Sequence, residues 1–526
     1  MAQFLKAQAA SRDIFPTPSN DLFLQHGIYA SLDATQQHIR LIRLSLDDHD
    51  GLIECHLLHP VPLAQARGNY TAISYCAGDP TKTSPILVNG VRFNVFANLA
   101  HVLDATRDYW RKTFPAPNST RDCLLWADQI CINQADLAER SHQVGFMRSI
   151  YACAEQTLIC LSTGQVETKG IEWLIQLHES VDPQGDFYMY YFRLEHHLRT
   201  KLADPRFTDG WLAFYDIFKS PWWTRTWVYQ EFISSTNIVF LYGKSSIPWR
   251  RVSEILPTLR KYRNFDHFGP HLIACESEVT ETIDVVNFFV ISKIRFDRVG
   301  PYDLMDLLAQ SRHLRSTDSR DRIYAFLGLV QHDFGIVPDY SPGNTIENLL
   351  VDVASKIIAQ TKRLDILSYA CAVRGPLSSH IPSWVPDWTS TSCSEVRTRT
   401  IQDPEDMCSN LPSPRIVLHS SGHHVLETQG YYLGTLGVVQ NWEPRVEFHG
   451  GNMIAEMAGL RYGRSKGGEG DQFWALLGAR NILVLRRSTV VDSAYQVVEE
   501  AEFRRNVNVH EMARRYALQC QTVLIV

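Results

Sequence analysis

The chain has 526 residues, of which 45% are hydrophobic, 21% charged and 11% aromatic, and its formal net charge is −6. That length exceeds one ordinary domain and is enough for two or three hydrophobic cores, and the composition is globular rather than fibrous or disordered. The acidic balance gives no support for a partner nucleic acid bound through a basic face.

Targeting and membrane-spanning segments are not expected from the sequence. Residues 1–20 lack the apolar core that a signal peptide needs. The apolar run at 284–294 is too short to cross a membrane and contains Lys293. We therefore expect a cytoplasmic protein with no membrane span.

Cysteine and histidine spacing predicts neither disulfides nor a metal site. The 11 cysteines are scattered, and none forms a C-x-x-C pair, so we expect reduced core thiols. The histidine groups at 195–197 and 419–424 lack the spacing of known zinc motifs. No metal and no cofactor are predicted.

Strand and helix patterns alternate along the first half of the chain. Two strands around a turn are predicted within 37–59. Four apolar runs have the character of buried strands: 70–75, 123–129, 156–162 and 237–243. Helical patterns lie between them, at 94–110 and from Val144 to Ala154. This alternation predicts an α/β fold with a doubly wound, mostly parallel sheet.

Changes in composition and in the strand and helix patterns along the chain predict four regions. Residues 1–69 hold N-terminal strands and a lead-in, and residues 70–245 form the α/β domain, with a helical insertion at 164–210. Residues 246–365 are mostly helical in pattern, and residues 366–526 form a smaller β-rich region.

The stretch WVYQE at 227–231 places a carboxylate in line with two indoles. If a helix begins at Pro221, then Trp223, Trp227 and Glu231 recur at i, i+4 and i+8 and share one face. Such a carboxylate is either half-exposed at a helix end or kept inside for chemistry. We further expect core positions at Trp222 or Trp223, at Trp227 and along 323–329, and a structural role for the charged residues 320–322.

Polar clusters follow or flank the predicted strands, where ligands bind in a doubly wound sheet. They are the turn Cys76, Ala77, Gly78 and Asp79, the group Asp128, Asn133 and Gln134, and Glu231. Each has a structural alternative: a tight turn at 78–80, backbone N–H groups bound by Asp128, or a helix cap at Asn133. Their convergence on one sheet edge favours a site.

Long motifs stand in the order typical of a known family. They are YTAISYCAGDP, LLWADQICINQADLAER, WWTRTWVYQEFISSTNIVFLYG, SRDRIYAFLGLV and IPSWVPDW. The chain resembles fungal heterokaryon-incompatibility (HET) domain proteins, with the domain over about residues 70–235 and flanking motifs from about 38 to 390. The family usually has Trp before the glycine of the first motif, whereas Ala77 stands here. That departure widens the pocket beside Gly78 or weakens an ancestral activity.

The HET family is distantly similar to TIR domains, which are flavodoxin-like and in some branches cleave NAD⁺. TIR enzymes carry a Trp-x-x-x-Glu helix with a catalytic glutamate, and Trp227 and Glu231 have that spacing. The resemblance thus implies a catalytic role for Glu231, while Asp128 is a catalytic candidate from its position at a strand end. The remaining candidates are substrate-binding: Cys76, Ala77, Gly78, Asp79, Asn133, Gln134 and Trp227.

Three functions stay open. The first, which we favour, is an incompatibility or cell-death effector that acts as an NAD⁺ glycohydrolase through Glu231 and is activated by assembly. NAD⁺ is then a substrate, and a homo-oligomer or an activating partner protein is expected. The second is a non-catalytic TIR-like module for self-association and signalling. The third is a HET-like enzyme of secondary metabolism that acts on another small molecule.

Overall fold

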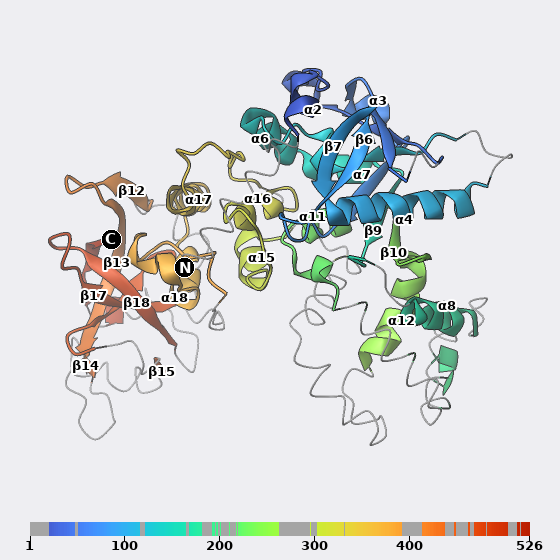
Figure 1. Cartoon of the computed structure of the whole chain (residues 1–526). Coiled ribbons are helices and arrows are strands. Elements are labelled where there is room, and N and C mark those ends of the chain that lie inside the picture. Colours follow the sequence, from blue (N-terminus) through green and yellow to red (C-terminus); the bar gives the residue numbers. More distant parts are fainter. Residues whose placement is uncertain are drawn as a thin grey trace. The chain divides into compact units, whose positions relative to one another are not determined.

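The structure is a computed structural model of the whole chain (Figure 1). It describes shorter pieces and single residues as well as the following ranges: 20–47, 51–115, 121–164, 168–180, 219–261, 302–330, 332–391, 413–436, 468–479, 481–502 and 517–526. The chain divides into two compact units. The first comprises residues 1–301, 313–329 and 338–341, and the second comprises 302–312, 330–337 and 342–526. The four regions predicted from the sequence divide the chain more finely and remain a prediction.

The first unit is built on a mixed sheet with nine strands among the described residues. Its spatial order is β11-β10-β9-β5-β8-β2-β3-β6-β7. The bounds are β2 Ile42–Leu44, β3 Glu54–Leu57, β5 Thr71–Tyr75, β6 Thr83–Val88, β7 Val91–Phe96, β8 Leu124–Trp126, β9 Gln156–Cys160, β10 Ile238–Tyr242 and β11 Ser245–Pro248. Every residue of β5 and β10 is buried, as their unbroken apolar runs predict for strands covered on both faces.

Parallel pairing is confined mainly to the centre of this sheet. The neighbours β8, β5, β9 and β10 pair in parallel, which confirms the alignment predicted for the four apolar runs. The expectation of a mostly parallel sheet is corrected by the rest, since β2 pairs antiparallel with β8 and β3, and β11 and β7 are antiparallel edge strands. The hairpin β6–β7 was not predicted. It turns at Asn89-Gly90, where both residues have positive φ, as a type I′ turn requires.

Helices cover this sheet and differ in detail from the prediction. Helix α4 (Ala97–Thr113) packs against β5, β6 and β7 (Figure 1). It begins three residues later than predicted, because residues 94–96 complete β7. The single helix expected around Val144 is two helices, α6 (Leu137–Gly145) and α7 (Met147–Cys153), which meet at Phe146. Within the predicted insertion, the structure describes α8 (Lys169–Ser180).

The segment that contains WVYQE is not one helix. A 3-10 helix η2 (Pro221–Thr224) ends at Arg225, whose backbone is extended at ψ 140°, and α11 (Val228–Ser234) begins afterwards. The prediction that Trp223, Trp227 and Glu231 share one helical face is therefore wrong. The extended residue resets the helical phase between the two elements.

The aromatic residues of this segment differ in burial. Trp222 and Trp223 are both 0% exposed, which confirms them as core. Trp227, at the start of α11, is only partly buried against the core, so its assignment to the core is corrected. Helix α16 (Asp321–Leu327) is buried at all its apolar positions, as predicted for this stretch.

The second unit combines helices with the expected β-rich region. Its helices are α15 (Leu304–Gln310), α17 (Ile346–Thr361), α18 (Ile366–Ala372) and the 3-10 helix η4 (Pro376–Ser379). Its described strands are β12 Arg415–Leu418, β13 His424–Leu436, β14 Val446–Phe448, β15 Arg461–Tyr462, β16 Gln472–Leu476, β17 Ile482–Arg487, β18 Tyr495–Glu502 and β19 Cys520–Ile525. Five of these strands pair in a closed ring: β13 with β16, β16 with β17, β17 with β18, β18 with β19, and β19 with β13 again.

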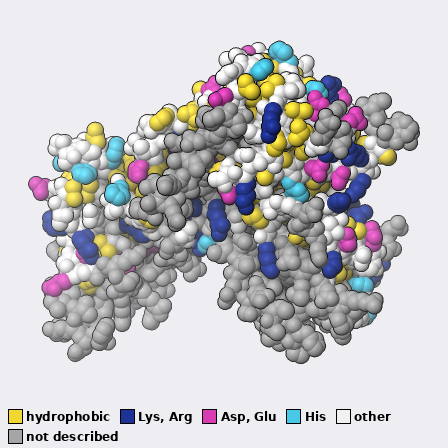
Figure 2. All heavy atoms as spheres, viewed as in Figure 1, with side chains coloured by type: hydrophobic (Ala, Val, Ile, Leu, Met, Phe, Trp, Pro, Cys, Tyr) yellow, Lys and Arg dark blue, Asp and Glu magenta, His cyan; other side chains and the backbone are white. Residues whose placement is uncertain are grey.

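Smaller elements complete the described chain. They are α2 Asp21–Gln25, η1 Ala34–Gln36, β1 His38–Ile39, β4 Val61–Pro62, α3 Leu63–Ala66, α5 Asp128–Cys131 and α12 Trp249–Lys261. Among the described residues, no helix has both the length and the apolar character to cross a membrane. Lys and Arg side chains lie among Asp and Glu side chains on the face shown in Figure 2, in keeping with the balanced charge.

Candidate functional site

Glu231 lies inside the first unit, in a buried ion pair. Its carboxylate is contacted by both Nη atoms of Arg225, at 3.0 Å to Oε2 and 3.1 Å to Oε1. The Ser74 hydroxyl, on β5, also donates to Oε2, and the same hydroxyl accepts the indole N–H of Trp222 at 2.7 Å. Four elements or linkers thus meet at one carboxylate: β5, η2, the extended residue and α11.

Solvent reaches this ion pair from the arginine side only. The side chain of Glu231 is 3% exposed and that of Arg225 is 19% exposed. Burial raises the pKa of Glu231, while Arg225 and the Ser74 hydroxyl act in the opposite direction. A bidentate arginine–carboxylate pair has well-defined geometry, so Glu231 is held in one orientation.

Asp128 lies close to this ion pair, at the first residue of α5. The Tyr75 hydroxyl, at the end of β5, donates to its Oδ1 at 3.1 Å, and the backbone N–H of Gln129 donates to the same oxygen at 2.7 Å. Arg225 interacts electrostatically with Glu231, Cys76 and Asp128. The structure therefore brings together three of the predicted residues: Asp128 and Cys76, both partly exposed, and buried Glu231.

The turn after β5 has a backbone that explains its glycine. Gly78 has φ +82°, and a Cβ built there would lie 2.5 Å from Nδ2 of Asn98. That amide donates to the carbonyl of Cys76 at 2.8 Å and ties the turn to α4. Ala77 is partly buried. Asp79 is exposed and accepts from the backbone N–H and hydroxyl of Thr81 at 2.9 and 2.7 Å, which lowers its pKa and matches the turn alternative.

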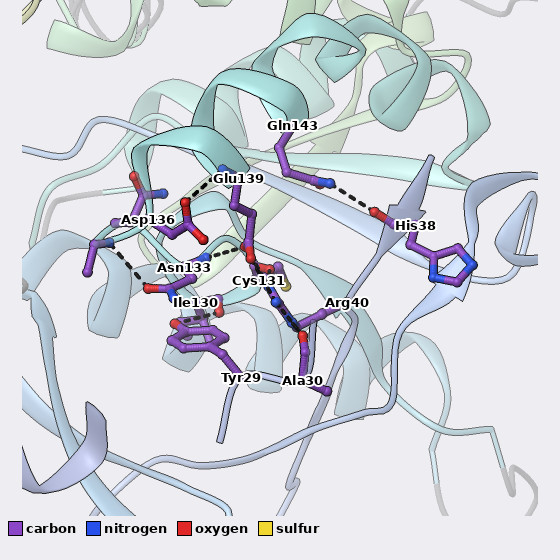
Figure 3. A network of polar contacts seen from close by, with 12 residues as sticks. Tyr29, Ala30, His38, Arg40, Ile130, Cys131, Asn133, Asp136, Glu139 and Gln143 are labelled. Atoms are coloured by element: carbon purple, nitrogen blue, oxygen red, sulfur yellow. Dashed lines mark hydrogen bonds and ion pairs between the residues drawn. The ribbon is translucent and has the colours of Figure 1, made fainter. Parts of the chain in front are cut away.

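Asn133 makes its hydrogen bonds within a separate polar network (Figure 3). Its backbone N–H donates to Glu139 at 2.6 Å, and Glu139 pairs with the buried guanidinium of Arg40 at 2.6 and 2.8 Å. The side-chain oxygen of Asn133 accepts from the N–H of Ala135 at 3.3 Å. Gln134 remains beside the site, since its amide donates to the Asp128 carbonyl at 2.9 Å.

Trp227 connects the site to α16. Its side chain makes a hydrogen bond to the carboxylate of Asp321. The same carboxylate also accepts a hydrogen bond from the Tyr340 hydroxyl at 2.5 Å. Burial raises the pKa of Asp321 to about 6. Arg320 pairs with Asp318 at 2.8 Å and donates to backbone carbonyls at 339 and 341.

Three residues of this site were missed in the sequence. Arg225 stands six residues before Glu231, a spacing that matches no helical face, and only the extended backbone between them allows the pair. Ser74 and Tyr75 lie within an apolar strand, where period-2 alternation gives no sign of a ligand-binding role. Next to them the side-chain N–H₂ of Gln129, a residue 2% exposed, makes no hydrogen bond within the described part of the chain.

The fold and the site define an α/β domain with a buried arginine–glutamate pair at the ends of parallel strands. The family model of the heterokaryon incompatibility protein (HET) matches residues 70–231. The chain is also 25% identical over 458 residues to heterokaryon incompatibility protein 6, OR allele, of Neurospora crassa. That match covers 77% of this chain and 65% of the relative, so the chain spans less than two thirds of the relative's length. No solved structure matches the chain significantly. Both comparisons support a fungal HET-domain protein, and residues 70–231 are the part of the chain that matches the family model.

Proposed function

We propose that the protein is an incompatibility or cell-death effector whose HET domain cleaves NAD⁺ at the cluster of Glu231, Arg225 and Asp128. The observation that carries this proposal is the convergence of two carboxylates and one guanidinium at the ends of β5 and β8. The Neurospora relative bears incompatibility in its name, which supports the biological half of the proposal.

Strand order supports a TIR-like site. Numbered along the chain, the parallel strands β8, β5, β9 and β10 stand in the order 2-1-3-4, which is the order of flavodoxin-like sheets. Ligands bind such sheets at the carboxyl ends of the strands beside strands 1 and 3. Ser74, Tyr75 and Cys76 lie at that end of strand 1, which is β5.

The proposed reaction is NAD⁺ plus water to nicotinamide, ADP-ribose and a proton. The bond from C1′ to the nicotinamide nitrogen breaks, and its electron pair neutralises the ring. Water then attacks C1′ and loses a proton. Because the leaving group departs neutral, the enzyme needs a carboxylate beside the developing ribosyl cation rather than a strong acid.

The two carboxylates would have different tasks. Asp128 is partly exposed and can face a ligand directly, whereas Glu231 is covered by Arg225. A pyrophosphate group has the charge and geometry to bind a guanidinium through two parallel hydrogen bonds, in a bidentate pair. If NAD⁺ draws Arg225 onto its pyrophosphate, Glu231 is released towards the ribose at the same moment.

A non-catalytic self-association module is the second candidate. It is favoured by the same ion pair, because both Glu231 oxygens already have partners and the residue has an adequate structural role.

The test is nicotinamide release from NAD⁺, measured per folded molecule for the full chain, both dilute and at concentrations that promote self-association. Glu231→Gln and Asp128→Asn should each lower turnover about a hundredfold or more. Asp122→Asn, which changes a carboxylate that is 60% exposed and 3.9 Å from Arg43, is the matched control and should keep wild-type turnover. Wild type that releases no nicotinamide in any assembly state would reject catalysis and favour the self-association module.

A further inference from the structure

The second unit contains a pocket that lies outside the HET domain. Its volume is about 660 Å³, within the range of pockets that bind metabolites. Its walls come from α17, from the loop at 378–383, from the turn at 422–424 and from the start of β18. The last three residues of that loop, 381–383, begin the IPSWVPDW motif, which contributes no residue to the site around Glu231.

Arg374, just after α18, lines this pocket with its charge uncompensated. Its Nη2 donates to the carbonyls of Ser383 and Val497, at 3.3 and 2.8 Å, and these bonds fix the plane of the guanidinium. Within the described residues, Nε and Nη1 make no hydrogen bond and no carboxylate pairs with the side chain, yet neither nitrogen is sealed from solvent. Burial accordingly lowers the pKa of Arg374.

Two acidic side chains in this region, Asp387 and Asp352, are engaged elsewhere. Asp387 accepts from the backbone N–H of Leu377 at 3.0 Å and from Thr389 at 3.1 and 2.5 Å. Asp352, on the α17 wall, pairs with Lys356 at 2.8 Å. A half-buried cation with donors to spare is costly unless an anion binds it.

The rest of the lining is polar and suits a small hydrophilic ligand. Three histidines, His380, His423 and His424, are among the residues that line the pocket, together with Ser379. Glu347 lies on the α17 side of the same pocket. An anionic group at Arg374 and a hydroxyl-bearing body towards Glu347 would satisfy both walls.

We infer that this pocket binds a small polar metabolite through a phosphate or carboxylate group held by Arg374. The two free N–H edges of the guanidinium supply charge-assisted hydrogen bonds to the anion, in a plane that the Ser383 and Val497 carbonyls set in advance. The site is independent of the proposed NAD⁺ chemistry, because none of its residues belongs to the HET domain.

The experiment titrates the full chain by calorimetry with glucose 6-phosphate, with citrate and with glucose, against sodium chloride at equal ionic strength. Glucose 6-phosphate represents the phosphate source and citrate the carboxylate source. At least one should bind saturably, while glucose and chloride should not. Arg374→Met should weaken that binding about tenfold or more.

Two further variants keep the outcome decisive if Arg374→Met does not fold. Ser379→Trp, at an exposed lining position, should block the pocket and abolish binding. Arg415→Met removes an arginine of the same unit that is already paired with Glu427 at 2.8 Å, and it should leave binding unchanged. The inference is overturned if neither anion binds wild type, or if binding survives either pocket variant.

Discussion

Arg225 and Glu231 join the two ends of the break between η2 and α11, with each guanidinium Nη on a separate carboxylate oxygen. The pair is asymmetric, because Arg225 keeps a path to water and Glu231 does not. Removing either partner therefore leaves a different unpaired charge behind, and this asymmetry is measurable.

Arg225→Met should destabilise the protein more than Glu231→Gln. The first leaves a carboxylate buried without its cation and should cost about 3–5 kcal/mol near pH 7, whereas the second leaves an arginine that can turn to solvent and should cost about 1–3 kcal/mol. The cost of Arg225→Met should shrink as pH falls, because Glu231 then takes up a proton. Urea unfolding at several pH values measures both. Equal, pH-independent losses would mean that the pair contributes nothing beyond packing.

Asp321 should make stability depend on pH. Its pKa in the folded protein is raised to about 6, from 3.8, by burial. The folded state therefore favours the protonated acid, and this contribution is complete below about pH 4 and is lost as pH rises through 6. Relative to Asp321→Asn, which stays neutral, wild type should lose at most about 3 kcal/mol of unfolding free energy across that window. A difference between the two proteins that stays constant from pH 4 to pH 7 would contradict the assignment.

Gly78 and Gly90 form a matched pair for testing the turn after β5. Both have positive φ, +82° and +76°, but only at Gly78 would a Cβ meet another side chain. Alanine at Gly90 should cost about 1 kcal/mol for backbone strain, and alanine at Gly78 about 1–2 kcal/mol more because Asn98 loses its bond to Cys76. Thermal melting of both variants gives the comparison. Equal losses would show that Asn98 does not fix the turn.

Cysteine reactivity should separate the site from the core. Burial raises the pKa of Cys55 and Cys131 to about 12 and that of Cys160 to about 11, so these thiols should resist alkylation in the folded protein. Cys76 and Cys520 are not buried and should be labelled by a maleimide. Peptide mass spectrometry reads each site, with urea-unfolded protein as the control in which all five react. Protection of Cys76 would mean that the turn is closed over the site.

The central strands were predictable because each is a buried apolar run between polar turns. The Asn89-Gly90 dipeptide is a recognisable local signal of a hairpin turn, although no strands are predicted from the sequence on either side of it. The pairing of β2 with β8 could not be foreseen, since it joins segments far apart in the chain and no local pattern sets such a register.

The site was predictable in part for the same reason. Asp128 and Cys76 follow strand ends, and the sheet gathers such ends along one edge. Arg225 could not be predicted as a site residue, because its contact with Glu231 depends on one extended residue inside an apparently helical run. Asn133 looked equivalent to Asp128 in sequence, but its backbone N–H is drawn to Glu139 by the Arg40 pair.

The position of β2 and β3 bears on what counts as a module in this protein. Both strands precede the segment that the family model matches, yet they sit in the middle of the sheet, between β8 and β6. A fragment limited to residues 70–231 would lose these two strands and also β10. The strands β8, β6 and β9 would then have edges with unpaired backbone groups, which favour aggregation. The segment that the family model matches is thus shorter than the sheet to which it belongs, so we expect that moving the domain into another protein requires its upstream strands as well.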